Sequence, residues 1–282
     1  HIMKLRYTPY QIVVDSVEDH ESKYHDVINN FESLDNLPVV VGTLHSMLTP
    51  FVASYKRNNP DKKIAYIMTD GAALPLYLSM NVKNLKQNGL IDSTITIGNA
   101  FGGDYECINI YTGLITAKEI AKADVVFVSM GPGIAGTGTK YGFTGIEQGQ
   151  ILDAVKKLGG NPIAIPRISF ADKRDRHQGI SHHSITVFDK IVNVDVNIPI
   201  TIYESQKLNK IKEQIKENKL DEKHNIIFIE NNKCKEDLEY FGLKVKSMGR
   251  NYDEDSEFFD SASSAAYYLM EVCHDWERKY CK

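Results

Sequence analysis

Short, unbroken apolar runs alternate with amphipathic segments through the first 170 residues of the chain. Continuous runs of this length are typical of strands buried on both faces of a parallel sheet. The segments between them are predicted to be helices, and Gly89 suits the end of one as a C-cap. The pattern predicts an α/β fold with a doubly wound, mainly parallel sheet between two helical layers, a Rossmann-like three-layer arrangement. The predicted strands of this region are 38–41, 63–69, 94–97, 124–130 and 162–168.

The remaining elements follow from weaker patterns. A helix capped by Thr116 is predicted over 116–123, and a charged helix with a solvated face over 203–224. The last helix, 256–276, has Phe258, Phe259, Ala262, Ala265, Ala266, Leu269 and Met270 available for its buried side. Further strands are predicted at 11–17, 106–111, 185–192, 225–230 and 243–248, and further helices at 25–31, 75–89 and 145–158.

Domain organisation is read from the same patterning. Residues 1–36 are expected to join the core, and residues 37–198 form the main α/β ligand-binding core. Polar composition rises near Pro199, so residues 199–282 are expected to form a C-terminal α/β extension packed on the core. A smaller subdomain over the same residues is the alternative.

Composition narrows the classes of function. The 282 residues are 42% hydrophobic and 25% charged, with a net charge of −4, which gives no reason to expect nucleic acid or membrane as a partner. No apolar run approaches the roughly 20 residues that span a bilayer, and no signal peptide is apparent. Four cysteines without CxxC spacing predict reduced thiols and a cytoplasmic protein. The first residue is His1, so a start further upstream is expected, and a homo-oligomer stays open.

A glycine-rich loop follows the run at 124–130 and reads G-x-G-x-x-G. Glycines allow positive φ and let an anion approach backbone N–H groups, which predicts a cradle for phosphate or a nucleotide. The loop departs from the dinucleotide fingerprint, because the next helix starts nearer Phe143 and the next strand ends in Arg167 instead of an acid. A structural turn is the alternative. The candidate contacts are Gly131, Gly133, Gly136, Thr137, Gly138 and Thr139.

A cluster of Arg, Asp, His and Ser follows the run at 162–168. Arginine offers a planar fork for phosphate or carboxylate, and histidine can move protons at neutral pH. The cluster therefore predicts an anion site, with Arg167, Arg174 and Arg176 neutralising the ligand and His177, His182, His183 and Asp172 as the catalytic candidates. If extended, the adjacent His182 and His183 would face opposite ways, and no zinc-spacing motif occurs, so no metal site is predicted. The alternative is a solvated, salt-bridged loop.

Polar residues also follow other predicted strands. Ligands of doubly wound sheets bind beyond the carboxyl ends of the strands, so these groups are expected to converge on one crevice. His45 and Asp70 have simpler interpretations as capping residues. Met248 to Arg250 and Asp253 to Asp255 are candidates to cover the same edge, although acidic capping of the last helix is the simpler interpretation. Asp70 is a further catalytic candidate, and the additional candidates are His45, Ser46, Asp104 and Ser181.

Several strings taken together resemble a bacterial family known as domain of unknown function 3866. They are RYTPYQ, LHSMLTP, YIMTDGAALP, GNAFGGDYE, GPGIAGTGTKYGFTG, RISFADKRDRHQGISHHS and SMGRNYDED. The resemblance covers about residues 6–255 and implies no established activity. It implies that these loops occur together, and that a small N-terminal segment precedes the first string.

The sequence favours an enzyme of unknown reaction that binds a phosphorylated or other anionic, nucleotide-like small molecule, with nucleotide or phosphate as the expected cofactor class. Two alternatives stay open. One is a metal-dependent hydrolase that uses the histidines and aspartates, and the other is a non-catalytic ligand sensor.

Overall fold

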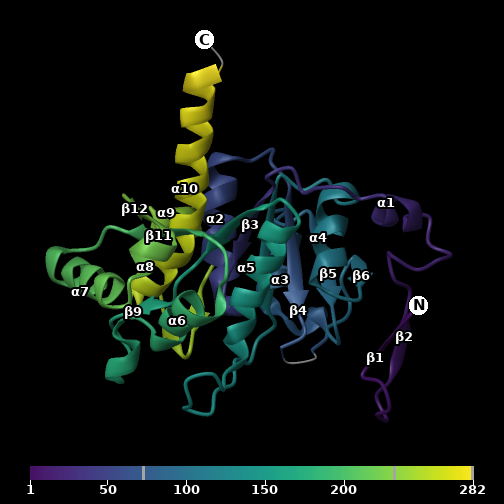
Figure 1. The fold of residues 1–282 in the computed structure, drawn as a ribbon, viewed down its shortest axis with the longest axis horizontal. Helices are drawn as coiled ribbons and strands as arrows, with labels where there is room; N and C mark the ends of the chain where they lie inside the picture. The colour runs from purple at the N-terminus through teal and green to yellow at the C-terminus, as the bar shows by residue number, and fades with distance from the viewer. Residues whose placement is uncertain (72–73, 231–232, 281–282) are drawn as a thin grey trace.

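The computed structural model describes residues 1–71, 74–230 and 233–280, and side chains as far as residue 272. Its centre is an eight-stranded sheet in which every neighbouring pair is parallel, which confirms the predicted fold class (Figure 1). The strand order is β12 (Asn225–Ile229), β11 (Asn197–Thr201), β8 (Asn161–Ala164), β3 (Pro38–Val41), β7 (Val125–Met130), β4 (Ile64–Thr69), β5 (Ser93–Ile97) and β6 (Tyr105–Cys107).

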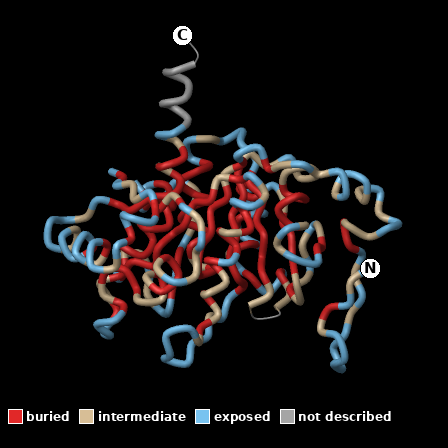
Figure 2. Tube along the Cα trace, in the orientation of Figure 1, coloured by how far each residue is buried: buried red, intermediate tan, exposed pale blue. Residues whose placement is uncertain are grey.

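The central strands are buried on both faces, as their unbroken apolar runs require. Successive side chains point to opposite faces, so Val40 joins one core cluster while Val39 and Val41 join the other. The first cluster includes α2 (Leu48–Asn58), α3 (Met80–Gln87), α9 (Cys234–Tyr240) and α10 (Ser256–Tyr280). The second includes α4 (Ile110–Glu119), α5 (Glu147–Lys157), α7 (Ser205–Glu217) and α8 (Leu220–Lys223). Figure 2 shows the buried sheet between these layers and the exposed loops around it.

Three antiparallel pairs lie outside the large sheet. The hairpin of β1 (Ile2–Lys4) and β2 (Ile12–Val14) stands at the right of Figure 1 and is followed by α1 (His25–Asn29). Its Lys4 is fully buried and donates to the carbonyl of Ala100 at 2.8 Å. The other pairs are β9 (Ile168–Ser169) with β10 (Gly179–Ile180), and β13 (Lys246–Ser247) with β14 (Arg250–Asn251). Short 3₁₀ turns cover His45–Met47, Leu76–Leu78, Thr144–Ile146 and Asp175–His177.

The strand predicted at 185–192 is wrong, because this segment is helical. It forms α6 (His182–Thr186) and a π-helical turn (Val187–Ile191). The side chain of Ser181 caps α6 by accepting from the N–H of His183 at 3.4 Å. Short apolar runs do not distinguish a strand from a buried helix by periodicity alone.

The helix predicted to start at Thr116 starts six residues earlier. The side chain of Asn109 accepts from the N–H groups of Tyr111 and Thr112, and so caps α4 at Ile110. The preceding strand β6 therefore ends at Cys107 instead of continuing to residue 111. Thr116 lies buried within the helix.

Several strands are shorter than predicted, and β11 of the large sheet was not predicted. The run at 162–168 leaves the sheet after Ala164, and the run at 243–248 contributes only Lys246–Ser247 to a small hairpin. Pro199, where a boundary was expected, lies inside β11 between β8 and β12. Proline removes a ladder donor, and β11 pairs with β8 through one residue pair.

Of the four cysteines, Cys107 and Cys234 are buried and free, whereas Cys273 and Cys281 lie outside the residues whose side chains are described.

Candidate functional site

The carboxyl ends of β3, β4, β7 and β8 lie at one edge of the sheet, because these strands are parallel and adjacent. The amide of the buried Gln148 fixes two of these ends. Its Nε2 donates to the carbonyl oxygen of Val41 at 2.8 Å and to that of Ile165 at 3.0 Å. The prediction that the loops after these strands share an edge is therefore confirmed.

The glycine loop forms a projecting turn beyond β7. Gly136 pairs with Phe143 in an antiparallel bridge, and Thr144 donates its N–H to the carbonyl of Ala135 at 2.9 Å. Gly133 and Gly138 have φ values of +111° and +78°, conformations that glycine adopts without the cost that a Cβ brings. The loop therefore needs glycine at both positions whether or not it binds an anion.

The hydroxyls of the two threonines at the tip of the loop are hydrogen-bonded within the loop. The hydroxyls of Thr137 and Thr139 lie 3.0 Å apart, and Thr137 also donates to the carbonyl of Gly142 at 3.0 Å. The following helix continues directly from the 3₁₀ turn Thr144–Ile146, and its first residue, Glu147, accepts from Thr69 at 2.6 Å. Thr137 and Thr139 line neither cavity described below, and the loop differs from a dinucleotide cradle in this respect.

The Arg–His segment and the glycine loop enclose a cavity of about 150 Å³, here called the basic pocket. All three predicted arginines and all three predicted histidines line it. The lining residues are Ile134, Ala135, Gly136, Gly138, Arg167, Arg174, Arg176, His177, His182, His183 and Met248.

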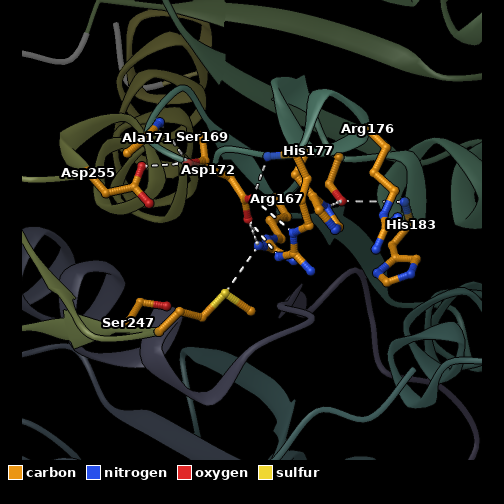
Figure 3. Close-up of polar contacts among 12 residues, drawn as sticks. Arg167, Ser169, Ala171, Asp172, Arg176, His177, His183, Ser247 and Asp255 are labelled. Atoms are coloured by element: carbon orange, nitrogen blue, oxygen red, sulfur yellow. Dashed lines mark hydrogen bonds and ion pairs between the residues drawn. The ribbon is translucent and has the colours of Figure 1, made fainter. Parts of the chain in front are cut away.

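The arginines share one carboxylate. Buried Asp172 accepts from Nε and Nη2 of Arg174 at 2.9 and 2.8 Å, and from Nη2 of Arg167 at 3.3 Å (Figure 3). The hydrogen bonds from Arg174 hold the pKa of the Asp172 carboxyl well below its usual value. Arg167 is 4% exposed, and burial lowers the pKa of its guanidinium. Arg176 also lines the pocket, so three guanidinium groups line it and two of them share this carboxylate.

The three histidine rings form a cluster. The centroids of His182 and His183 lie 4.0 Å apart, and those of His177 and His182 lie 4.8 Å apart. The expectation that His182 and His183 face opposite ways assumed an extended chain and is wrong, because both residues lie in α6. Ser181, a further candidate, orients this cluster through a 2.8 Å hydrogen bond between its hydroxyl and Nδ1 of His177.

Burial and nearby charges lower the pKa of all three rings. Desolvation, followed by Arg167, lowers the pKa of His177 to about 3, and desolvation, followed by His182 and Arg167, lowers that of His183 to about 4. The His183 ring stacks on Phe143 with centroids 4.1 Å apart. Its Nδ1 is buried and has no hydrogen-bond partner among the described residues. A neutral imidazole with an unpartnered nitrogen can exchange a proton with a ligand in the pocket.

A second cavity, of about 400 Å³, lies beside the basic pocket under the hairpin of β13 and β14, and is here called the hairpin cavity. Its buried His45 is held by two hydroxyls, Tyr66 Oη at 3.0 Å from Nδ1 and Ser79 Oγ at 2.6 Å from Nε2. Desolvation lowers the pKa of His45 to about 4. The lining residues are Leu44, His45, Ser46, Asn81, Met130, Gly131, Pro132, Gly133, Ile134, Lys246, Ser247 and Met248.

None of the three predicted aspartates lines either cavity, although Asp172 pairs with two arginines that line the basic pocket. Asp70 follows β4, but it accepts from the N–H and the side-chain amide of Asn99, both at 3.0 Å, and so links two loops. Asp104 precedes β6 and pairs with Lys86 and Thr94, so it lies at the opposite, amino end of its strand. The sequence alone could not reveal this, because the loop between β5 and β6 crosses from one edge to the other.

The hairpin of β13 and β14 supplies residues of the candidate site to which the sequence assigned no role in ligand binding. Met248 and Gly249 both have positive φ, +49° and +86°, which is the conformation of a two-residue type I′ turn. Ser247 accepts a hydrogen bond from Ser46 at 2.9 Å and so closes the hairpin over the edge. Asn81, Tyr66 and Ser79 carried no signal in the sequence, because single polar residues in apolar or helical runs are common.

Comparison with known families identifies the family of the chain. A family model described as "Protein of unknown function (DUF3866)" matches residues 1–266. The chain belongs to this family. No curated protein matches the chain.

Among the described residues, no group of three or more His, Cys, Asp or Glu side chains is arranged to hold a metal ion. None of the helices in the described part of the chain is long and apolar enough to cross a bilayer.

Proposed function

We propose that this chain binds a phosphorylated or otherwise anionic small molecule in the basic pocket. The observation that carries the proposal is the guanidinium of Arg167, which is 4% exposed and lines the cavity beside Arg174 and Arg176. A buried positive charge is costly unless it is paired, and two of the three guanidinium groups at the pocket share one carboxylate. An anion in the pocket supplies the missing negative charge.

The size of the pocket suits a single anionic group. The basic pocket encloses about 150 Å³, less than half the volume of the adjoining hairpin cavity at about 400 Å³. Arginine forks match the oxygens of phosphate or carboxylate in bidentate geometry. The neutral histidines can donate one hydrogen bond each without adding charge that would repel the arginines.

The proposed chemistry is proton transfer by His183. Its unpartnered Nδ1 accepts a proton from the bound molecule or returns one to it, and the ring is held in place by Phe143. Bound phosphate favours the imidazolium and raises the pKa of the ring from about 4 toward neutrality. Binding thus creates the base that the free protein lacks.

Titration calorimetry with inorganic phosphate tests the binding step. Arg176 is exposed, so Arg176→Gln removes one charge from the pocket with little effect on folding. We expect this variant to lose about tenfold or more in phosphate affinity. Lys216→Gln removes an equally exposed charge on α7 and serves as the matched control. Equal phosphate affinities in Arg176→Gln and Lys216→Gln would contradict the proposal.

A second candidate function is a ligand sensor, which the fully satisfied hydroxyls of Thr137 and Thr139 favour, because the loop tip then serves the fold rather than the ligand. Phosphorus NMR on sugar and nucleoside monophosphates incubated with the protein separates the two. Conversion that slows about a hundredfold in His183→Asn identifies the enzyme. Binding without any conversion by the parent protein identifies the sensor.

A further inference from the structure

The hairpin cavity and the basic pocket are adjoining parts of one site. Ile134 and Met248 line both of them, and the glycine loop forms their common wall. Gly131 and Gly133 face the larger cavity, whereas Gly136 and Gly138 face the smaller one. A molecule anchored by an anionic group in the basic pocket therefore has its remaining atoms directed toward the hairpin cavity or toward solvent.

The hairpin cavity has the size and lining of a ligand site. Pockets for small molecules are typically about 300–1,000 Å³ and mainly apolar with a few polar groups, and this one encloses about 400 Å³. Leu44, Met130, Pro132 and Ile134 supply its apolar surface. Both ring nitrogens of His45 are already bonded, so this residue forms a rigid part of the wall and does not bind the ligand through hydrogen bonds.

Two polar side chains of the hairpin cavity have no partner among the described residues. The half-buried amide of Asn81, in the first turn of α3, makes no hydrogen bond to them, and the ammonium of Lys246 makes no ion pair. The hydroxyls of Ser46 and Ser247 bond to each other at 2.9 Å and leave one donor for a further bond. The wall therefore offers mostly donors, and suits a ligand rich in acceptors.

We propose that the hairpin cavity binds the uncharged part of a phosphate monoester whose phosphate occupies the basic pocket. The donors of the wall select an acceptor-rich group, the chemistry of a sugar or a nucleobase. This proposal rests on the proposed function, because it needs the phosphate in the basic pocket. It adds Asn81, Lys246 and the β13–β14 hairpin as the residues that determine specificity.

The test compares inorganic phosphate with ribose 5-phosphate and the common nucleoside 5′-monophosphates by titration calorimetry on the full chain. We expect at least one ester to bind the parent protein about tenfold or more tightly than inorganic phosphate. Lys246→Met removes a donor, and Asn81→Phe fills the cavity. Each is expected to reduce that advantage about tenfold while leaving the affinity for inorganic phosphate within about twofold.

Matched controls are close in the chain. Lys244 is exposed like Lys246, and Asn84 is a more exposed residue than Asn81 in the same helix. Neither lines either cavity, so Lys244→Met and Asn84→Phe should leave every affinity unchanged. If phosphate binds and no ester binds more tightly, or if both cavity variants keep the full advantage, this inference is overturned and the proposed function survives. If inorganic phosphate and the esters all fail to bind the parent protein, both proposals are overturned.

Discussion

The guanidinium of Arg167 donates to the sulfur of Met248 at 3.1 Å, across 81 positions of sequence. One residue follows β8 and is buried, and the other stands at the turn of the C-terminal hairpin. The contact connects the basic pocket to the hairpin that covers it. Met248 has a left-handed backbone, φ +49°, which is uncommon for residues other than Gly, Asn and Asp.

The turn of the hairpin should therefore respond to the backbone preference of its first residue. Met248→Asn is expected to keep or raise the free energy of unfolding, because Asn-Gly is the favoured pair of a type I′ turn. Met248→Val is expected to lower it by about 1–2 kcal/mol, because a β-branched residue is strained at positive φ. Urea denaturation of the two variants measures the difference. A Val variant as stable as the Asn variant would contradict this account of the turn.

Removal of the shared carboxylate should cost stability in a pH-dependent way. Asp172→Asn leaves buried Arg167 without its counter-ion, and we expect a loss of about 3 kcal/mol at pH 7. Because the folded-state pKa of Asp172 is depressed, its contribution is present above the unfolded pKa of about 3.9 and is lost as the pH falls toward the folded pKa.

Urea unfolding at pH 7 and pH 3 measures this change, with Asp61→Asn as an exposed control. The difference between the parent and Asp172→Asn should shrink at the lower pH. A difference that is constant with pH would show that Asp172 acts by packing instead of charge.

The buried histidines should make the protein less stable in mild acid. Burial lowers the pKa of His45 and His183 to about 4, against about 6.5 in an unfolded chain. Between these pH values the unfolded state binds protons that the native state does not, so the free energy of unfolding falls as the pH falls from about 6.5 to about 4. His183→Gln should lose less stability over this range than the parent. Denaturation curves at pH 6.5 and pH 5 provide the test, and identical losses would argue against a neutral His183.

Phosphate should change the protonation of the same residue. If the anion binds beside His183, its ring C–H resonances should titrate at higher pH in the presence of saturating phosphate. Proton NMR with and without phosphate follows this shift, and Arg176→Gln should need about tenfold more phosphate to produce it. Resonances that titrate identically in both conditions would place the anion elsewhere.

Gly138 and Gly142 of the glycine loop should resist substitution by alanine for different reasons. A Cβ at Gly138 meets nothing within 4 Å. Gly138→Ala should therefore lower the free energy of unfolding only through the strain of its φ of +78°, by about 1 kcal/mol. A Cβ at Gly142 would collide with the hydroxyls of Thr137 and Thr139, so Gly142→Ala should break the loop tip as well. Thermal unfolding should show the larger loss for Gly142→Ala. Restoration of stability by the added change Thr137→Ala would locate the collision.

The sequence by itself determined the central strands of the sheet and the place of the candidate site along the chain. Strands buried on both faces must be continuous apolar runs, so the strands at 38–41, 63–69 and 124–130 could be predicted without any tertiary information. The parallel order then required the loops after these strands to share an edge. For that reason the glycine loop and the Arg–His cluster could be paired before their geometry was known.

Only the tertiary structure decided how the candidates meet. His182 and His183 come together because Ser181 caps a helix that the apolar pattern of 185–192 did not reveal. Asp104 is excluded from the site because its loop crosses to the amino end of β6, and Met248 joins it from a hairpin 81 positions beyond Arg167. Local patterns record which face of an element is buried, whereas long-range contacts depend on packing between elements that share no sequence signal.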